Sequence, residues 1–97
     1  MKFEWDKAKE LSNVSKHGVT FEQASYVFAD PYALSLYDDA HSDSENRWIM
    51  LGSSLGKTLL LVVHTFRDDN DVELVRIISA RRATRQEKEI YHQRSPL

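Results

Sequence analysis

The spacing of apolar residues changes at Pro31, and this change constrains the fold more than any other feature of the 97-residue chain. Before Pro31, apolar residues recur every three or four positions, which is the period of an amphipathic helix. After Pro31 they alternate with polar residues or form short runs between turn residues, as is typical of β-strands. The sequence therefore predicts helices first and an antiparallel sheet after them.

Two helices are expected before Pro31. Asp6 can cap the first helix, and Gly18 is the type of residue that ends one. Thr20 and Gln23 have the spacing of a capping box at the start of the second helix. The apolar positions at helical spacing are Ala8, Leu11 and Val14 in the first helix and Phe21, Ala24, Val27 and Phe28 in the second.

Strands are expected on both sides of these helices. A short strand covers residues 3–5, and the later segments with strand patterns are 33–37, 47–53, 58–66 and 72–79. Thr84 and Glu87 form a second capping box, which begins a last helix anchored by Ile90 and Tyr91. The order β-α-α-β-β-β-β-α predicts one α+β domain over residues 1–97, with one mainly antiparallel sheet and helices packed on one face.

Composition excludes several classes of protein. The chain has no cysteine, which rules out disulfide scaffolds, zinc–cysteine sites and thiol catalysis. No apolar run approaches the ~20 residues of a membrane helix, and the first residues lack a signal sequence, so a cytoplasmic protein is expected. The net charge is −2, yet residues 76–97 contain 6 Lys or Arg and only 2 Asp or Glu. The negative net charge argues against a strong general nucleic-acid binder, but the basic segment 76–97 leaves room for a basic patch.

Three groups of motifs, at the start, middle and end of the chain, resemble those of the BrnT toxin family. The resemblance covers roughly residues 3–91. The residues that carry it are Phe3-Glu4-Trp5-Asp6, Lys9, Asn13, Lys16-His17-Gly18-Val19, Phe21-Glu22, Val27-Phe28 and Asp30-Pro31 at the start, His41-Ser42, Glu45, Arg47-Trp48, Gly52 and Ser54 in the middle, and Arg76 to Thr84, Glu87 and Tyr91 at the end.

The resemblance implies a RelE-like fold and a ribonuclease toxin of a type II toxin–antitoxin system, which cuts RNA and inhibits translation. It also implies a BrnA-like antitoxin with a ribbon-helix-helix part, usually in a complex with two copies of each protein. Such a complex represses its own operon, so the toxin would meet operator DNA only through the antitoxin. No membrane partner is implied.

RNA cleavage without a metal needs groups that move protons and groups that stabilise charge on the phosphate. Arginine suits the second role, because its planar guanidinium can donate two parallel hydrogen bonds to the oxygens of one phosphate. With the resemblance, the expected catalytic residues are Arg81, Arg82, Arg47, His17, His41 and Glu45, and the expected RNA-binding residues are Lys9, Lys16, Arg76 and Arg85. No metal or other cofactor is expected, because the His, Asp and Glu residues lack the spacing of known ligand motifs.

Other interpretations stay open. Arg76 could form an internal ion pair, Glu45 could orient Arg47, and His17 could cap the last turn of its helix. His64, within an apolar strand, is expected to be a core residue. For the whole protein, the alternative is a catalytically degenerate toxin-like module that only binds its antitoxin, which the acidic balance favours.

Overall fold

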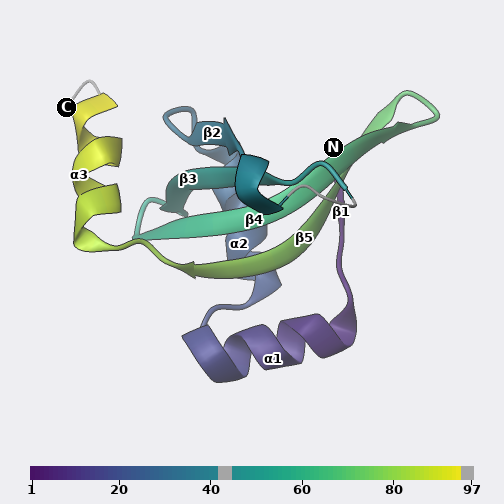
Figure 1. Ribbon diagram of the computed structural model, residues 1–97, viewed down its shortest axis with the longest axis horizontal. Helices are drawn as coiled ribbons and strands as arrows, with labels where there is room; N and C mark the ends of the chain where they lie inside the picture. Colours follow the sequence, from purple (N-terminus) through teal and green to yellow (C-terminus); the bar gives the residue numbers. More distant parts are fainter. Residues whose placement is uncertain (42–44, 95–97) are drawn as a thin grey trace.

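A five-stranded sheet forms the centre of the computed structural model, which describes residues 1–41 and 45–94 (Figure 1). The strand order is β1-β5-β4-β3-β2. Consecutive strands from β2 to β5 pair antiparallel, and β1 pairs parallel with β5. The strands are β1 (Lys2–Glu4), β2 (Leu34–Tyr37), β3 (Trp48–Ser54), β4 (Thr58–Asp69) and β5 (Val72–Arg82).

The helices occupy the predicted places in the chain. They are α1 (Lys7–His17), α2 (Phe21–Ser25) and α3 (Arg85–Arg94), with 3₁₀ turns η1 (Tyr26–Ala29) and η2 (Asp39–His41). The order of strands and α-helices is β-α-α-β-β-β-β-α, which confirms the predicted α+β fold. Among the described residues, none of these helices has the length and apolar content to span a membrane.

The helix ends follow the predicted capping chemistry. Asp6 accepts a hydrogen bond from the backbone N–H of Lys9, and Gly18 ends α1 with a left-handed φ of 68°. Thr20 and Gln23 form a complete capping box at α2. At α3, the Thr84 and Glu87 side chains each accept a hydrogen bond from the other residue's backbone N–H.

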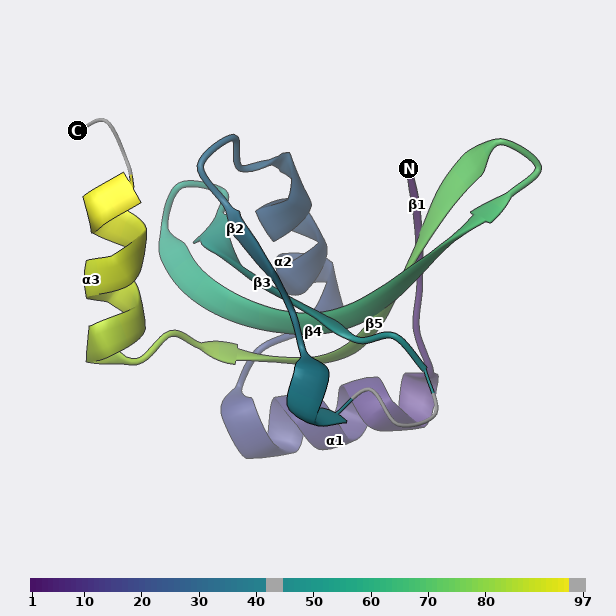
Figure 2. The same ribbon diagram turned by 45° about the horizontal axis from the view of Figure 1, so that its top comes forward.

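The hairpin between β4 and β5 extends further than predicted (Figure 2). The predicted strands 58–66 and 72–79 left residues 67–71 between them, but β4 continues to Asp69 and β5 begins at Val72. Only Asn70 and Asp71 form the turn, and both have positive φ, 52° and 66°. Two left-handed residues give a tight turn whose twist matches that of the strands, so pairing continues up to it.

The main core lies on the face of the sheet that α1 and α2 cover. Phe21, Ala24 and Val27 are fully buried against strands β4 and β5. The strand residues of this cluster are Leu60 and Val62 on β4 and Val75, Ile77 and Ala80 on β5. The prediction for this helical stripe is confirmed, except that Phe28 is only partly buried, because α2 tightens into the 3₁₀ turn η1 before reaching it.

A polar residue anchors α1. Leu11 and Val14 are 61% and 39% exposed, so the apolar spacing in this helix does not mark its buried side. Asn13 is buried instead, and its amide donates to the carbonyls of Val19 (2.9 Å) and Ala80 (2.8 Å) and accepts from the N–H of Ala80 (3.0 Å). This one side chain thus pairs backbone groups of Val19 and Ala80 that would otherwise be buried without hydrogen-bond partners.

The prediction that all helices pack on one face is wrong for α3. Tyr91 of α3 is buried with Leu34, Leu51 and Ala83, in a second cluster separate from the main core. Met50 packs against the main core, and neighbouring strand residues point to opposite faces, so Leu51 lies on the other face with α3. Ile90, the other expected anchor, is 51% exposed.

Candidate functional site

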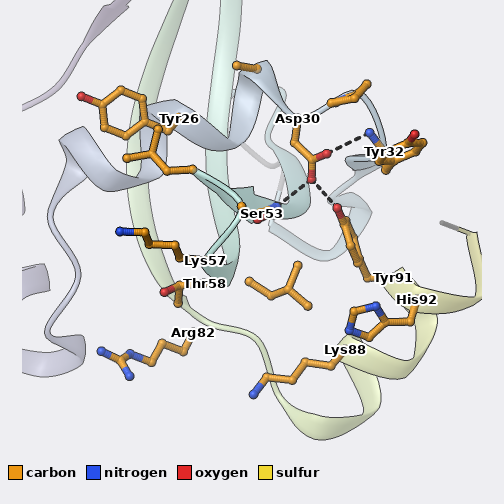
Figure 3. A pocket seen from close by; sticks show the side chains of 15 residues that line it. Tyr26, Asp30, Tyr32, Ser53, Lys57, Thr58, Arg82, Lys88, Tyr91 and His92 are labelled. Carbon is orange, nitrogen blue, oxygen red and sulfur yellow. Dashed lines mark hydrogen bonds between the residues drawn. The ribbon is translucent and has the colours of Figure 1, made fainter. Parts of the chain in front are cut away.

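A cavity of about 850 Å³ lies between α3, the turn that joins β3 to β4, and the segment that joins η1 to β2 (Figure 3). We call it the α3 cavity. Its lining includes apolar residues of the β3–β4 turn and a set of polar, charged and aromatic side chains. That set is Tyr26, Asp30, Tyr32, Ser53, Lys57, Thr58, Arg82, Lys88, Tyr91 and His92.

Three cations from three different elements line the α3 cavity. Lys57 comes from the β3–β4 turn, Arg82 ends β5, and Lys88 lies on α3. All three are exposed, and none forms an ion pair within residues 1–41 and 45–94. Their charges therefore remain available to an anion that enters the cavity.

Among the described residues that line this cavity, Asp30 is the only carboxylate, and three donors satisfy it. It accepts hydrogen bonds from the Tyr91 hydroxyl (2.6 Å) and from the backbone N–H groups of Ser53 (2.7 Å) and Tyr32 (3.0 Å). Burial raises the pKa of Asp30, but these hydrogen bonds outweigh it and the net pKa is lowered. Burial and the bond to Asp30 raise the pKa of Tyr91 to about 12. At neutral pH, Tyr91 is therefore a protonated donor that ties α3 to the segment after η1.

Arg81 holds the other end of α3. Its guanidinium donates two hydrogen bonds to the Glu87 carboxylate, at 2.8 and 2.9 Å. The bond from Arg81 is the largest cause that lowers the pKa of Glu87, to about 2, against the opposing effect of burial. Arg81 was expected to be catalytic, but in this structure its planar fork is occupied by Glu87, so its evident role is to fix α3.

A second, smaller cavity of about 240 Å³ continues toward the end of α1. We call it the α1 cavity, and it is lined by Gly18, Val19, Gln23, Ser54, Leu55, Lys57, Thr58, Leu60 and Arg82. The two cavities share Lys57 and Arg82. His17 is exposed and directly precedes Gly18, but this predicted proton-transfer residue is not part of the lining of either cavity.

Three further predicted catalytic residues lie elsewhere. Arg47 precedes β3 and forms an ion pair with Glu45 at 3.5 Å, as the alternative interpretation of Glu45 anticipated. The other end of β3 reaches the α3 cavity, a strand length of roughly 20 Å away. The backbone of His41 ends η2, but its side chain and the neighbouring Ser42 lie outside what the structure describes.

The predicted RNA-binding residues are also dispersed. Arg76 pairs with Glu4 at 3.6 Å, and Arg85 pairs with Glu89 at 3.8 Å on the exposed side of α3. Lys9 and Lys16 are exposed on α1. The structure thus groups Arg82 with Lys57 and Lys88. Lys88 belongs to the basic segment 76–97 in which a basic patch was expected, but neither lysine was predicted to bind RNA. No local pattern marks Lys57, because only the fold brings the β3–β4 turn opposite α3.

Within the described part of the chain, no group of three or more His, Asp and Glu side chains is placed to hold a metal ion. The α3 cavity contains one carboxylate and one histidine together with its three cations, a set that suits an anion better than a cation.

Comparisons with known proteins agree with this architecture. Residues 5–87 match the family described as the ribonuclease toxin, BrnT, of a type II toxin-antitoxin system. The structure is similar to the crystal structure of the Brucella abortus ribonuclease toxin BrnT, with a TM-score of 0.62 and 24% sequence identity over 88% of this chain and 99% of that chain. No curated protein sequence matches the chain.

Proposed function

Because the chain belongs to the BrnT family of ribonuclease toxins of type II toxin–antitoxin systems, we propose that it cleaves RNA without a metal ion and thereby inhibits translation. The observation that carries this proposal is the α3 cavity, which is lined by three cations that form no ion pair with another described residue, in a protein of net charge −2. An anionic polymer such as RNA is the substrate that this arrangement suits.

The chemistry we propose is attack of a ribose 2′-oxygen on the adjacent phosphorus. The 2′-hydroxyl loses its proton, the bond from phosphorus to the 5′-oxygen breaks, and that oxygen takes up a proton. Arg82 would stabilise the charge that develops on the phosphate, because its cationic guanidinium is not engaged by a carboxylate among the described residues. His17, which directly precedes Gly18 of the α1 cavity lining, is the proposed proton carrier, since an imidazole can both accept and donate a proton.

The proposed partner is a BrnA-like antitoxin with a ribbon-helix-helix part. In the assembly we propose, two copies of each protein combine, the antitoxin neutralises the toxin, and the complex represses its own operon in the cytoplasm. Family membership supports an antitoxin partner. Contact with operator DNA would run through the antitoxin, because the toxin's own net charge is negative.

Cleavage of a naked, end-labelled RNA by the purified chain in EDTA tests the proposal. We expect cleavage by the wild type and a loss of about 100-fold or more in Arg82→Ala, as for removal of a preorganised charge-stabilising group. Arg67→Ala is the matched control, because Arg67 lies on β4 and pairs with Glu4, away from the α3 cavity.

Growth arrest in cells separates the remaining outcomes. Wild-type protein should arrest growth, Arg82→Ala should not, and both should bind the antitoxin. If the wild type neither cleaves RNA nor arrests growth but still binds the antitoxin, the ribonuclease proposal is wrong and the degenerate binding module takes its place. If Arg82→Ala cleaves as fast as the wild type, the assignment of Arg82 is wrong.

A further inference from the structure

We propose that the α3 cavity and the α1 cavity together form a binding track for single-stranded RNA, in which Lys57 and Lys88 hold phosphates on either side of Arg82. This inference rests on the proposed ribonuclease function and extends it to two lysines that the sequence did not predict as RNA-binding and to RNA in single-stranded form.

The charge of the track is strongly positive for this protein. Lys57, Arg82 and Lys88 line it, whereas most other described arginines are held by glutamates, as Arg81 is by Glu87 and Arg76 by Glu4. Among the described residues, Asp30 is the only acidic residue in either lining, and its carboxylate is directed to three internal donors. A phosphate in the track would therefore meet three cationic lining residues, while the one carboxylate of the described lining is already hydrogen-bonded.

The two cavities are neighbours. Leu55, Lys57, Thr58 and Arg82 line both of them, so two cations lie between the cavities. A polymer that occupies both cavities would place the phosphate between two nucleotides at Lys57 and Arg82. The next phosphate would reach Lys88 on α3, and the opposite end of the strand would approach Gly18 beside His17.

The α3 cavity also has the size and the lining for a base. Its volume of about 850 Å³ lies within the range of pockets that enclose small organic ligands. Tyr26 and Tyr32 line it and are 37% and 42% exposed, so their rings are accessible (Figure 3). Aromatic side chains next to cations are typical of sites that stack unpaired bases, whereas bases within a duplex cannot reach such rings.

Binding and cleavage must be measured separately to test the track. The binding probe is a fluorescein-labelled 2′-O-methyl RNA of roughly eight nucleotides, which cannot be cleaved because its 2′-oxygen is blocked. Anisotropy is recorded at several salt concentrations for the wild type, Lys57→Ala and Lys88→Ala. Lys2→Ala is the matched control, since Lys2 is an exposed lysine without an ion pair on β1, at the far edge of the sheet.

We expect Lys57→Ala and Lys88→Ala each to weaken binding by about three- to tenfold and to reduce the slope of log affinity against log salt by about 0.7, the loss of one phosphate contact. Lys2→Ala should bind like the wild type, and a duplex of the same sequence should bind more weakly than the single strand. All three lysines are exposed, so circular dichroism should confirm that the variants fold.

Failure of the track and failure of the ribonuclease proposal give different results. If the wild type cleaves ordinary RNA but both lysine variants bind the probe as tightly as the wild type, the track is wrong and the function stands. If the probe binds through these lysines but the wild type neither cleaves ordinary RNA nor arrests growth, the track stands and the ribonuclease proposal is wrong. If polyglutamate of equal charge displaces the probe as well as RNA does, the track takes an acidic protein segment and the RNA assignment is overturned.

Discussion

Replacing Glu87 with Gln should destabilise the protein in a pH-dependent way. Glu87 caps α3 and accepts two hydrogen bonds from Arg81, and these contacts lower its pKa from an ordinary 4.5 to about 2. Without solvent screening, a pKa difference of that size between the folded and unfolded chain would correspond to roughly 3 kcal/mol of folding stability. The Arg81 side chain is 38% exposed, so solvent screening reduces the expected loss to about 1–2 kcal/mol. Gln retains an oxygen for the Thr84 N–H, so the change removes mainly the charge.

The pH dependence follows from the direction of this pKa change. The ion pair contributes in full above about pH 4.5, the pKa in the unfolded chain, and its contribution is lost as the pH falls through about 2. Urea unfolding followed by tryptophan fluorescence should therefore show the full difference between wild type and Glu87→Gln near neutral pH. The difference should shrink steadily below pH 4.5.

Glu89→Gln is the control for this prediction. Glu89 lies on the same helix and pairs with Arg85 at 3.8 Å, but the two side chains are 64% and 96% exposed. Its replacement should change stability little, because exposed pairs contribute little. Equal stability of Glu87→Gln and wild type near neutral pH would refute the reasoning. So would a difference that persists undiminished at the acid end of the titration.

Three further predictions concern buried contacts. The wild type should lose stability as the pH falls below about 6.5, because burial lowers the pKa of His64 and only the unfolded chain then binds the proton. His64→Leu should not show this loss. If the urea midpoint changes equally between pH 7.5 and 5.5 in both proteins, the prediction is contradicted. Gly52→Ala should lower the free energy of unfolding by about 1–3 kcal/mol, since its Cβ would lie 2.8 Å from Val27 Cγ1; an unchanged melting temperature would show that the core yields. Tyr91→Phe should cost about 1.5–2 kcal/mol in urea unfolding by removing the 2.6 Å bond to Asp30, and a loss near zero would mean that water replaces the hydroxyl.

Local signals in the sequence were sufficient for the elements and their order. The caps at Asp6, Thr20 and Thr84 and the left-handed Gly18 depend only on residues within one helical turn, and the structure contains all of them. Alternation after Pro31 predicted the strands for the same reason, because the side-chain period of a strand is a local property. The resemblance to BrnT proteins was likewise readable from motifs in chain order and is confirmed.

Long-range contacts decided the rest. Asn13 anchors α1 because the fold brings the end of β5 to it, 67 residues away in sequence, and its neighbours Leu11 and Val14 give no sign of this. Arg81 and Arg82 are adjacent in sequence, yet the Arg81 side chain is hydrogen-bonded to Glu87, whereas Arg82 lines the α3 cavity.

The sequence by itself therefore determined the α+β fold, the positions where the helices begin and the family, since each depends on residues close together in the chain. Only the tertiary structure decided which cations share a site. The α3 cavity is lined by Lys57, Arg82 and Lys88 because α3 packs on the second face of the sheet. There Tyr91 is buried beside Leu51 and donates a hydrogen bond to Asp30. Which charges remain unpaired depends on carboxylates placed by distant segments, and no local pattern encodes that placement.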